Sequence, residues 1–279
     1  MHHNPISVTN LSYAYGDGTQ ALREINIEIK ATERVALIGA NGSGKSTLLR
    51  HLNGILPTQQ GRIVVGEQAI APETLTQIRN FVGIVFQNPD DQLFMPTVWE
   101  DIAFGPLNQG IVEPVLTDRI KQSMAAVGLD FDHYAERAAS NLSGGEKKRV
   151  AIAGVLAMQP QVLVLDEPSA QLDPASRRQL IELLQRLPLT QLIATHDLDM
   201  VLELCSSTIV LGQGSVVFSG PTEQVLNNPE FLRQHSLEPP LCYARPYCQL
   251  EHAPDTSPPP VISATLPENP LVSSFKVAQ

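Results

Sequence analysis

The chain has 279 residues, 43% of them hydrophobic and 17% charged, which is enough to bury the core of one large domain or of two ordinary ones. Acidic residues outnumber basic ones, 29 to 19, and the formal net charge of -10 argues against nucleic acid or anionic lipid as the principal partner. No apolar run approaches the roughly 18 to 20 residues that cross a bilayer, and the amino terminus lacks the pattern of a secretory signal. We therefore expect a cytoplasmic protein without direct insertion into lipid.

The cysteines predict no structural or catalytic site. Cys205, Cys242 and Cys248 form no C-x-x-C pair, and an odd number of cysteines supplies no disulfide framework. Cys242 and Cys248, two thiols in a proline-rich stretch, could ligate a metal, but such pairs are far more often incidental. We assign no role to these thiols, nor to His2 and His3 at the amino terminus.

The first part of the chain predicts mainly strands. Apolar residues partly alternate from Ile6 to Ile29, and Gly16 to Gly18 marks a turn, so an antiparallel hairpin is expected. The continuous apolar run from Val35 to Ile38 predicts a strand that is buried on both faces. Two further strands are expected at Arg62 to Val65 and at Phe81 to Phe86.

A glycine-rich loop, Gly39-Ala40-Asn41-Gly42-Ser43-Gly44-Lys45-Ser46, lies between the buried strand and a helix expected over Ser46 to Leu52. Strand, loop and helix in this order are the context of a P-loop. Glycines let the backbone N–H groups approach the β- and γ-phosphates, Lys45 adds a positive charge, and Ser46 offers a hydroxyl to Mg²⁺. The residues predicted to bind ATP here are Gly39, Asn41, Gly42, Ser43, Gly44, Lys45 and Ser46.

The middle of the chain predicts helices. From Trp99 to about Ala139 apolar residues recur at helical spacings, and Glu146 to Met158 predicts another helix that Pro160 stops. We interpret the stretch at about 95–158 as a helical insertion between two halves of one nucleotide domain. Core strands at Val162 to Leu165 and Gln191 to Thr195, with a helix at Ser176 to Leu187, are expected to complete that domain.

Two acids follow the strand expected at Val162 to Leu165. Asp166 stands at the carboxyl end of the strand, where a carboxylate can reach Mg²⁺ through water. An acid that merely ends a strand is the simpler interpretation of Asp166 alone. Glu167 beside it favours catalysis, because a second acid facing the γ-phosphate can orient or deprotonate the attacking water.

Four segments of the chain stand in the order that is typical of ATP-binding-cassette ATPases. They are Gly39 to Ser46, Leu142 to Glu146, Leu163 to Pro168, and Thr195 to Asp197. The chain resembles this family over about residues 6–220. The resemblance implies an α/β fold of the P-loop NTPase class, with a RecA-like core, an antiparallel β subdomain, a helical subdomain and a short C-terminal extension.

The resemblance also implies roles for single residues. Glu167, His196 and Gln87 would form the catalytic set, with His196 on the γ-phosphate and Gln87 sensing Mg²⁺ and the attacking water. Tyr15 would stack on adenine, and Thr47 would contact the α-phosphate. Mg²⁺ would be held by Ser46, Gln87 and Asp166.

Two of these roles have simpler alternatives. Tyr15 could be an ordinary strand aromatic, with Tyr13 as the weaker candidate for the stacking role. His196, taken alone, would more often be a core histidine, but it follows an apolar strand, and an imidazole can donate to a phosphate oxygen.

The loop Ser143-Gly144-Gly145 offers a hydroxyl, free N–H groups and a helix amino end to an anion. In the family that the chain resembles, this loop binds the ATP of a second ATPase subunit, so that two ATP molecules are held head to tail between two chains. Asp173 would lie at the seam between the subunits. Two positions depart from the common family pattern: Glu146 stands where Gln is usual, and Gln171 where Gly or Ala is usual.

Three further segments resemble the energy-coupling-factor ATPases, especially the cobalt and nickel importer branch. They are Val85 to Phe94, Ile102 to Asn108, and Leu142 to Gly154. The resemblance implies a peripheral subunit at the cytoplasmic face of the cell membrane, whose partners are a second ATPase subunit, a transmembrane coupling protein and a substrate-capture membrane protein. Asp90 to Phe94 and the following helices would line a groove for coupling helices. The alternative is that Phe94 and its neighbours simply pack the helical insertion.

Other functions remain open at this point. The transported solute could be a vitamin or another small molecule instead of a metal ion. A non-transport cassette ATPase is disfavoured, because the sequence has no coiled-coil insertion, no tandem cassette and no basic excess. A regulatory module without turnover is disfavoured by the presence of Lys45, Asp166, Glu167 and His196.

The expected domain organisation places the ATPase domain at 1–220 and a short helical extension at 221–241. Nine of the chain's 22 prolines lie between residues 239 and 279, where little periodicity remains. We expect residues 242–279 to form a proline-rich, disordered tail.

Overall fold

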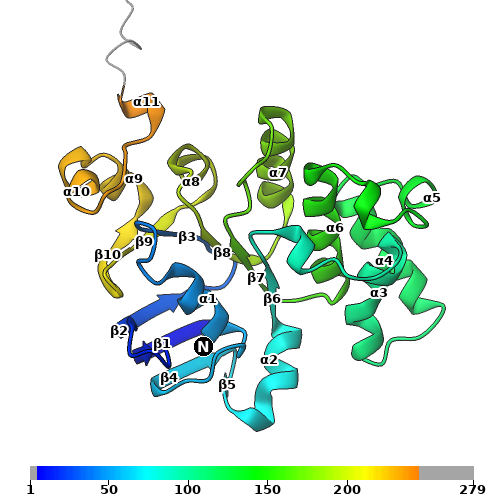
Figure 1. Cartoon of the computed structure of the whole chain (residues 1–279), viewed down its shortest axis with the longest axis horizontal. Helices are drawn as coiled ribbons and strands as arrows, with labels where there is room; N and C mark the ends of the chain where they lie inside the picture. The colour runs from blue at the N-terminus through cyan, green and yellow to red at the C-terminus, as the bar shows by residue number, and fades with distance from the viewer. Residues whose placement is uncertain (1–4, 245–279) are drawn as a thin grey trace, which may run out of the picture. The chain divides into compact units, whose positions relative to one another are not determined.

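A computed structural model describes residues 5–244 of the chain, which contain two β-sheets and the helices around them (Figure 1). The smaller sheet is antiparallel, with the strand order β2-β1-β4-β5. Its strands are β1 (Ile6–Ala14), β2 (Gln20–Ile29), β4 (Gln60–Val65) and β5 (Gln68–Ala69). The hairpin expected between Ile6 and Ile29 is confirmed by the pairing of β1 with β2.

The larger sheet has the strand order β10-β9-β3-β8-β7-β6. All neighbouring strands are parallel except β10, which runs antiparallel to β9 at one edge. The strands are β3 (Arg34–Ile38), β6 (Val82–Val85), β7 (Val162–Asp166), β8 (Thr190–Ala194), β9 (Ser207–Gly212) and β10 (Ser215–Pro221).

The continuous apolar runs in this sheet follow from its burial on both faces. Successive side chains of a strand point to opposite faces. Val162 and Val164 of β7 pack in one core cluster with the smaller sheet and with α1 (Lys45–Leu52). Leu163 and Leu165 pack in a second cluster, on the opposite face. Both faces of the strand therefore need apolar side chains.

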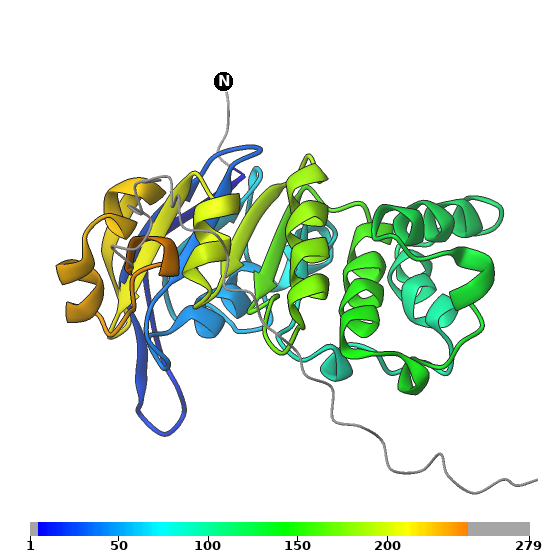
Figure 2. The same cartoon turned by 90° about the horizontal axis from the view of Figure 1, so that it is seen from above.

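Helices of the second cluster cover the face of the large sheet opposite α1. They include α7 (Pro174–Arg186) and α8 (Leu198–Leu204), which lie above the sheet in Figure 1 and side by side in Figure 2. On the other face, α1 lies between the two sheets, and α2 (Leu75–Phe81) leads directly into β6.

A group of helices stands at the β6 end of the large sheet, on the right of Figure 1. In it α6 packs against both α3 and α4. The group consists of α3 (Val98–Asn108), α4 (Val115–Ala126), α5 (Phe131–Tyr134) and α6 (Gly144–Ala157). Single 3₁₀ turns, η1 (Pro72–Thr74), η2 (Pro89–Asp91) and η3 (Ala139–Asn141), lie in the connections. Within residues 5–244, no helix has the length and apolar character to span a membrane.

The described part of the chain ends in three short helices beyond β10. They are α9 (Thr222–Leu226), α10 (Pro229–Gln234) and α11 (Leu241–Ala244). The short helices expected after residue 221 are therefore present. The predicted proline-rich tail at 242–279 lies outside the described residues, apart from its first three positions, which belong to α11.

Several expected elements need correction at their boundaries. The helices expected at Ser46 to Leu52 and at Ser176 to Leu187 are α1 (Lys45–Leu52) and α7 (Pro174–Arg186), and the strands expected at Arg62 to Val65 and at Gln191 to Thr195 are β4 (Gln60–Val65) and β8 (Thr190–Ala194). The strand expected from Phe81 to Phe86 is shorter, because Phe81 is the last residue of α2 and β6 covers only Val82–Val85. The helix expected from Glu146 begins earlier, at Gly144, because Ser143 already serves as its N-cap.

Candidate functional site

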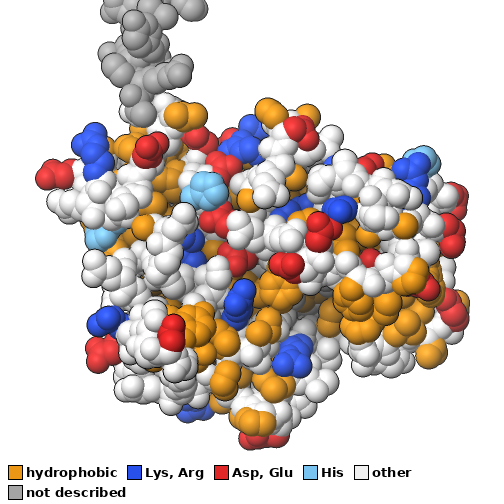
Figure 3. Space-filling view, viewed as in Figure 1, with side chains coloured by type: hydrophobic (Ala, Val, Ile, Leu, Met, Phe, Trp, Pro, Cys, Tyr) orange, Lys and Arg blue, Asp and Glu red, His pale blue; other side chains and the backbone are white. Residues whose placement is uncertain are grey.

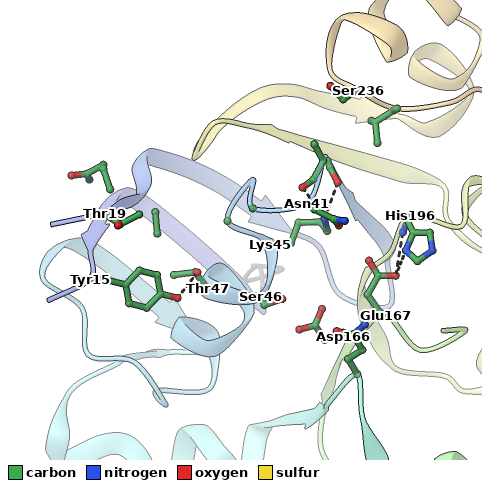
Figure 4. A pocket seen from close by; sticks show the side chains of 18 residues that line it. Tyr15, Thr19, Asn41, Lys45, Ser46, Thr47, Asp166, Glu167, His196 and Ser236 are labelled. Atoms are coloured by element: carbon green, nitrogen blue, oxygen red, sulfur yellow. Dashed lines mark hydrogen bonds and ion pairs between the residues drawn. The ribbon is translucent and has the colours of Figure 1, made fainter. Parts of the chain in front are cut away.

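A pocket of about 960 Å³ lies where the parallel strands of the large sheet end. Since the carboxyl ends of parallel strands meet at one edge of a sheet, this is where such folds bind ligands. The residues after β3, β6, β7 and β8 all contribute to it (Figure 4). Of the residues predicted to form the site, the pocket is lined by Tyr15, Gly39, Asn41, Gly42, Gly44, Lys45, Ser46, Thr47, Gln87, Asp166, Glu167 and His196.

The glycines of the first loop are required by both conformation and space. Gly44 has φ of 105°, and a Cβ there would stand 2.7 Å from the Ala21 carbonyl oxygen. A Cβ on Gly39 would stand 2.4 Å from the Leu211 carbonyl oxygen. The loop therefore packs closely against the backbone of Ala21 and Leu211, and its opposite side faces the pocket. Ser43 does not line the pocket, because its side chain is buried beneath the loop.

Lys45 is a buried cation in the floor of the pocket. Its ammonium donates to the Gly39 carbonyl at 2.7 Å and to the Ala40 carbonyl at 3.2 Å. Burial lowers the pKa of Lys45, and the charges of Glu167 and Asp166 partly oppose that shift. Among the described residues, this buried positive charge donates hydrogen bonds to carbonyls of its own loop, an arrangement well suited to an anionic ligand.

Asp166 has the features of a cation ligand. Its carboxylate is buried, and its Oδ1 atom has no hydrogen-bond partner among the described residues. Burial raises the pKa of Asp166, while a hydrogen bond with the Ser46 side chain lowers it. Carboxylate and hydroxyl oxygens are the ligands that Mg²⁺ prefers. Asp166 and Ser46 therefore fit a magnesium ion at this position.

Glu167 is fixed in place by the end of β8. Its Oε2 atom lies 2.8 Å from Nδ1 of His196 and accepts a hydrogen bond of 3.2 Å from the backbone N–H of His196. Its own N–H donates to the Ala194 carbonyl, and its φ of 46° is in the left-handed region. The carboxylate is nearly buried, whereas the His196 side chain is 69% exposed. An acid and an imidazole are thereby joined at the open side of the pocket.

Tyr15, at the other end of the pocket, belongs to a ring of contacts with Thr47, His51 and Tyr13. The Tyr15 hydroxyl lies 2.8 Å from Oγ1 of Thr47, and the Thr47 carbonyl lies 2.8 Å from Nδ1 of His51. The His51 ring meets Tyr13 edge to face at 4.6 Å, and Tyr13 meets Tyr15 in the same way at 5.2 Å. The ring of Tyr15 is therefore held from two sides and is partly exposed to the pocket.

The second glycine loop lies apart from this pocket. Ser143, Gly144 and Gly145 are absent from the pocket lining and stand at the amino end of α6. Ser143 caps the helix in a capping box with Glu146, whose Oε2 atom accepts hydrogen bonds of 2.7 Å from both the N–H and the hydroxyl of Ser143. One chain therefore does not bring its two glycine loops to one site.

Several residues that line the pocket were not predicted from the sequence. Ala40 and the side chains after the β1–β2 turn take part, and so do two residues after α10; they are Thr19, Gln20, Ala21, Ala40, Ser236 and Leu237. Only Ala40 carried a signal, because it lies inside the P-loop motif. The others carry no motif and reach the pocket through the packing of distant elements.

The model of the ABC transporter family matches residues 22–170 of the chain, which is more than half of its length. The chain belongs to the ABC transporter family. An ABC transporter ATP-binding protein of Gloeobacter violaceus is 56% identical over 241 residues, which cover 86% of this chain and 99% of that protein.

Further members of the family match most of the chain at lower identity. The energy-coupling factor transporter ATP-binding protein EcfA of Methanoculleus marisnigri is 46% identical, over 84% of this chain and 86% of that protein. The structure of CbiO1 from Clostridium perfringens, described as part of the ABC transporter complex CbiONQ, is 40% identical with a TM-score of 0.73. That match covers 83% of this chain and 94% of CbiO1.

These comparisons confirm the expected fold and enzyme class. The chain is the ATP-binding domain of an ABC transporter, an α/β ATPase that uses ATP. The roles of single residues, among them the catalytic set of Glu167, His196 and Gln87, stay predictions. So do the exact domain boundaries.

Proposed function

We propose that this chain is the ATP-hydrolysing subunit of an energy-coupling-factor importer. The proposal is supported by its likeness to ATP-binding proteins named for such transporters, at 46% and 45% identity. The observation that carries it is the pocket itself, where a P-loop, a buried carboxylate and a carboxylate–imidazole pair converge. Such a subunit would work as a peripheral protein at the cytoplasmic face of the cell membrane.

The nucleotide would be held along the length of the pocket. Tyr15 would stack on adenine, Thr47 would contact the α-phosphate, and the P-loop N–H groups with Lys45 would surround the β- and γ-phosphates. Ser46, Asp166 and Gln87 would hold Mg²⁺, which supplies positive charge to the phosphate oxygens when it is bound.

Hydrolysis would depend on the paired groups at the strand ends. Glu167 would accept a proton from the attacking water, and Gln87 would orient that water. His196 would donate a hydrogen bond to the γ-phosphate. Its contact with Glu167 keeps the imidazole at the pocket.

The proposal is tested by Glu167→Gln, which keeps the size of the side chain but removes the base. We expect ATP turnover to fall by about 100-fold or more, the usual worth of a general base, while ATP binding persists and an ATP-bound dimer accumulates. Phosphate release and light scattering measure the two effects. Glu182→Gln on the exposed side of α7 is the matched control. Full ATPase activity in Glu167→Gln would overturn the assignment.

A second ATPase subunit is part of this proposal. Ser143, Gly144 and Gly145 would bind the ATP of a partner chain, since they do not line the pocket of their own. ATP would then join two subunits head to tail, and hydrolysis would release them. The partner could be a second copy or a related chain, because the arrangement requires only complementary loops.

The coupling surface is proposed to lie over α3. Phe94 and Phe104 meet edge to face at 5.0 Å, yet they are 64% and 42% exposed, and Leu107 is exposed beside them. Figure 3 shows hydrophobic side chains gathered over this part of the molecule. Side chains that simply packed the helical insertion would be buried. An exposed apolar patch is typical of a protein interface, here for the coupling helices of a transmembrane protein that works with a substrate-capture protein.

Cobalt or nickel is the solute we propose, from the resemblance of residues 85–94, 102–108 and 142–154 to that importer branch. A vitamin or another small solute is the alternative. Purifying the membrane assembly and measuring which solute stimulates ATP hydrolysis and uptake decides between them. Recovery of the chain with DNA or ribosomes would instead favour a non-transport ATPase.

A further inference from the structure

Lys148 is a buried cation whose position the proposed ATPase chemistry does not explain. It lies in the second turn of α6 and is only 3% exposed. Lysine side chains are almost never fully buried unless they are paired. The ammonium of Lys148 donates to the backbone carbonyl of Gln87 at 2.5 Å and approaches that of Phe86 at 3.5 Å.

Two more side chains join the same segment to α6. Lys147 forms an ion pair of 2.7 Å with Asp90, and the Gln92 amide donates to the Ala151 carbonyl at 3.2 Å. The Gln92 side chain also accepts a hydrogen bond from the N–H of Phe86. β6 ends at Val85, so the sheet no longer holds the chain at Gln87. Hydrogen bonds and an ion pair with α6 hold this segment in place instead.

The charge of Lys148 also faces the acidic end of β7. Burial lowers the pKa of Lys148 to about 8, whereas the nearby charges of Asp166 and Glu167 act to raise it. Lys45 faces the same two acids from the P-loop. Lys148 is therefore a second cation beside the acidic pair, and it belongs to the helix that carries Ser143 to Gly145.

We propose that Lys148 is a positioning residue, which ties the Gln87 segment of the chain's own pocket to the helix that presents the Ser143 loop to a partner chain. This inference rests on the proposed function. A shift of α6 on docking of the partner's nucleotide would move Gln87 with it, because the ammonium binds the Gln87 backbone directly. Each pocket thereby responds to the occupancy of the other.

The test replaces Lys148 by Met, which keeps most of the apolar length of the side chain but removes its donors. We expect kcat for ATP to fall about 10- to 100-fold, because a misplacement of about 1 Å can cost that much, while KM changes less than about threefold. Lys148→Arg keeps a charged donor and should recover most of the activity. Lys147→Met is the matched control, and its kcat should stay within about twofold, since its exposed ion pair contributes little.

A double-mutant cycle separates positioning from general loss of structure. In the Gln87→Ala background, Lys148→Met should change kcat less than about twofold, because the side chain that it positions is absent. An equal fall in kcat in both backgrounds would overturn the proposal. Activity of Lys148→Met within twofold of the wild type would also overturn it.

Hydrogen exchange gives a readout that needs no ATP turnover. Amides of Phe86 to Leu93 should exchange at least about tenfold faster in Lys148→Met than in the wild type or in Lys147→Met, since local opening follows the loss of the tether. Unchanged exchange would contradict the positioning role. A wild-type chain without ATPase activity would instead contradict the proposed function, and the exchange result would still decide the role of Lys148. Lys148→Gln replaces Lys148→Met if the latter does not fold.

Discussion

Glu146 binds Ser143, the residue that is proposed to contact a phosphate of the second subunit's ATP. Its carboxylate accepts from the hydroxyl and the N–H of Ser143 and from the hydroxyl of Tyr134 at 2.7 Å. These hydrogen bonds lower the pKa of Glu146 to about 2. In the free chain the Ser143 proton is thus directed to its own helix, beside a permanent negative charge.

We expect Glu146→Gln to strengthen ATP-dependent dimerisation about two- to fivefold. A single charge at a helix amino end is worth about 0.3–1 kcal/mol, and here it repels the incoming phosphate. Sedimentation with a non-hydrolysable ATP analogue measures the dimer, with Glu182→Gln as the control. A weaker dimer would mean that the capping box matters more than the charge.

Tyr15 combines a partly exposed ring with a hydroxyl that is fixed by Thr47. Tyr15→Phe removes only the hydroxyl contact, so KM for ATP should rise about two- to tenfold, the worth of one hydrogen bond, without a change in kcat. Tyr15→Ala should raise KM further, because loss of stacking costs about 1–3 kcal/mol. Nucleotide titration and steady-state kinetics measure both variants. Equal KM values for the wild type and Tyr15→Ala would remove the stacking role.

The first two turns of α6 carry several of its contacts. Its N-cap Ser143 and Glu146 form the capping box, and Lys147 and Lys148 bind the segment that follows β6. The amino end of α6 therefore combines the N-cap, the contacts with the segment after β6 and the second glycine loop. A change at Ser143, Glu146 or Lys148 is therefore expected to alter stability or turnover, whereas the exposed ion pair of Lys147 contributes little.

The cap makes the stability of the chain depend on pH. The pKa of Glu146 is lower in the folded chain than its ordinary value of 4.5, so its contribution is complete above that value and is lost as the pH falls towards about 2. Glu146→Gln should lower stability by about 0.5–1 kcal/mol near neutral pH. The difference from the wild type should shrink below about pH 4.5, as thermal unfolding at several pH values would reveal. A constant difference would show that the charge plays no part.

Across the whole molecule, the proposed site of ATP hydrolysis and the proposed coupling surface lie in separate regions. The pocket lies at the strand ends, whereas Phe94 and Phe104 do not line it and are exposed on or next to α3. Replacing both by Ala should leave ATP turnover of the isolated subunit within about twofold. Retention of the membrane partners should fall at least about tenfold, because apolar contacts dominate such interfaces, and copurification measures this. Unchanged retention would place the coupling surface elsewhere.

Sequence patterns were informative where one local rule decides the structure. The apolar run at Val35 to Ile38 predicted a strand buried on both faces, and the P-loop motif predicted the glycine-rich floor of the pocket. Lys148 could not be found in this way, because a lysine in a run of charged residues is usually solvated, and only packing reveals its burial.

The unpredicted elements have a similar explanation. β10 is an edge strand whose side chains are half-buried or exposed, and α8 has only seven residues, so neither has a strong periodic pattern. Gln171 adopts φ of 63° between Glu167 and Asp173, a conformation that its residue type does not suggest. Ser236 and Leu237 reach the pocket through tertiary packing alone.

β3, the strand that leads into the P-loop, limits how short a fragment of this chain can be and still fold. Both hydrogen-bonded neighbours of β3, namely β8 and β9, begin after residue 170, where the match to the family model ends. A fragment limited to residues 22–170 would hold every P-loop residue, yet it would leave both edges of β3 without a partner strand. The segment that matches the family model is therefore shorter than the unit that folds. We expect a fragment of this chain to bind nucleotide only if it extends through β9.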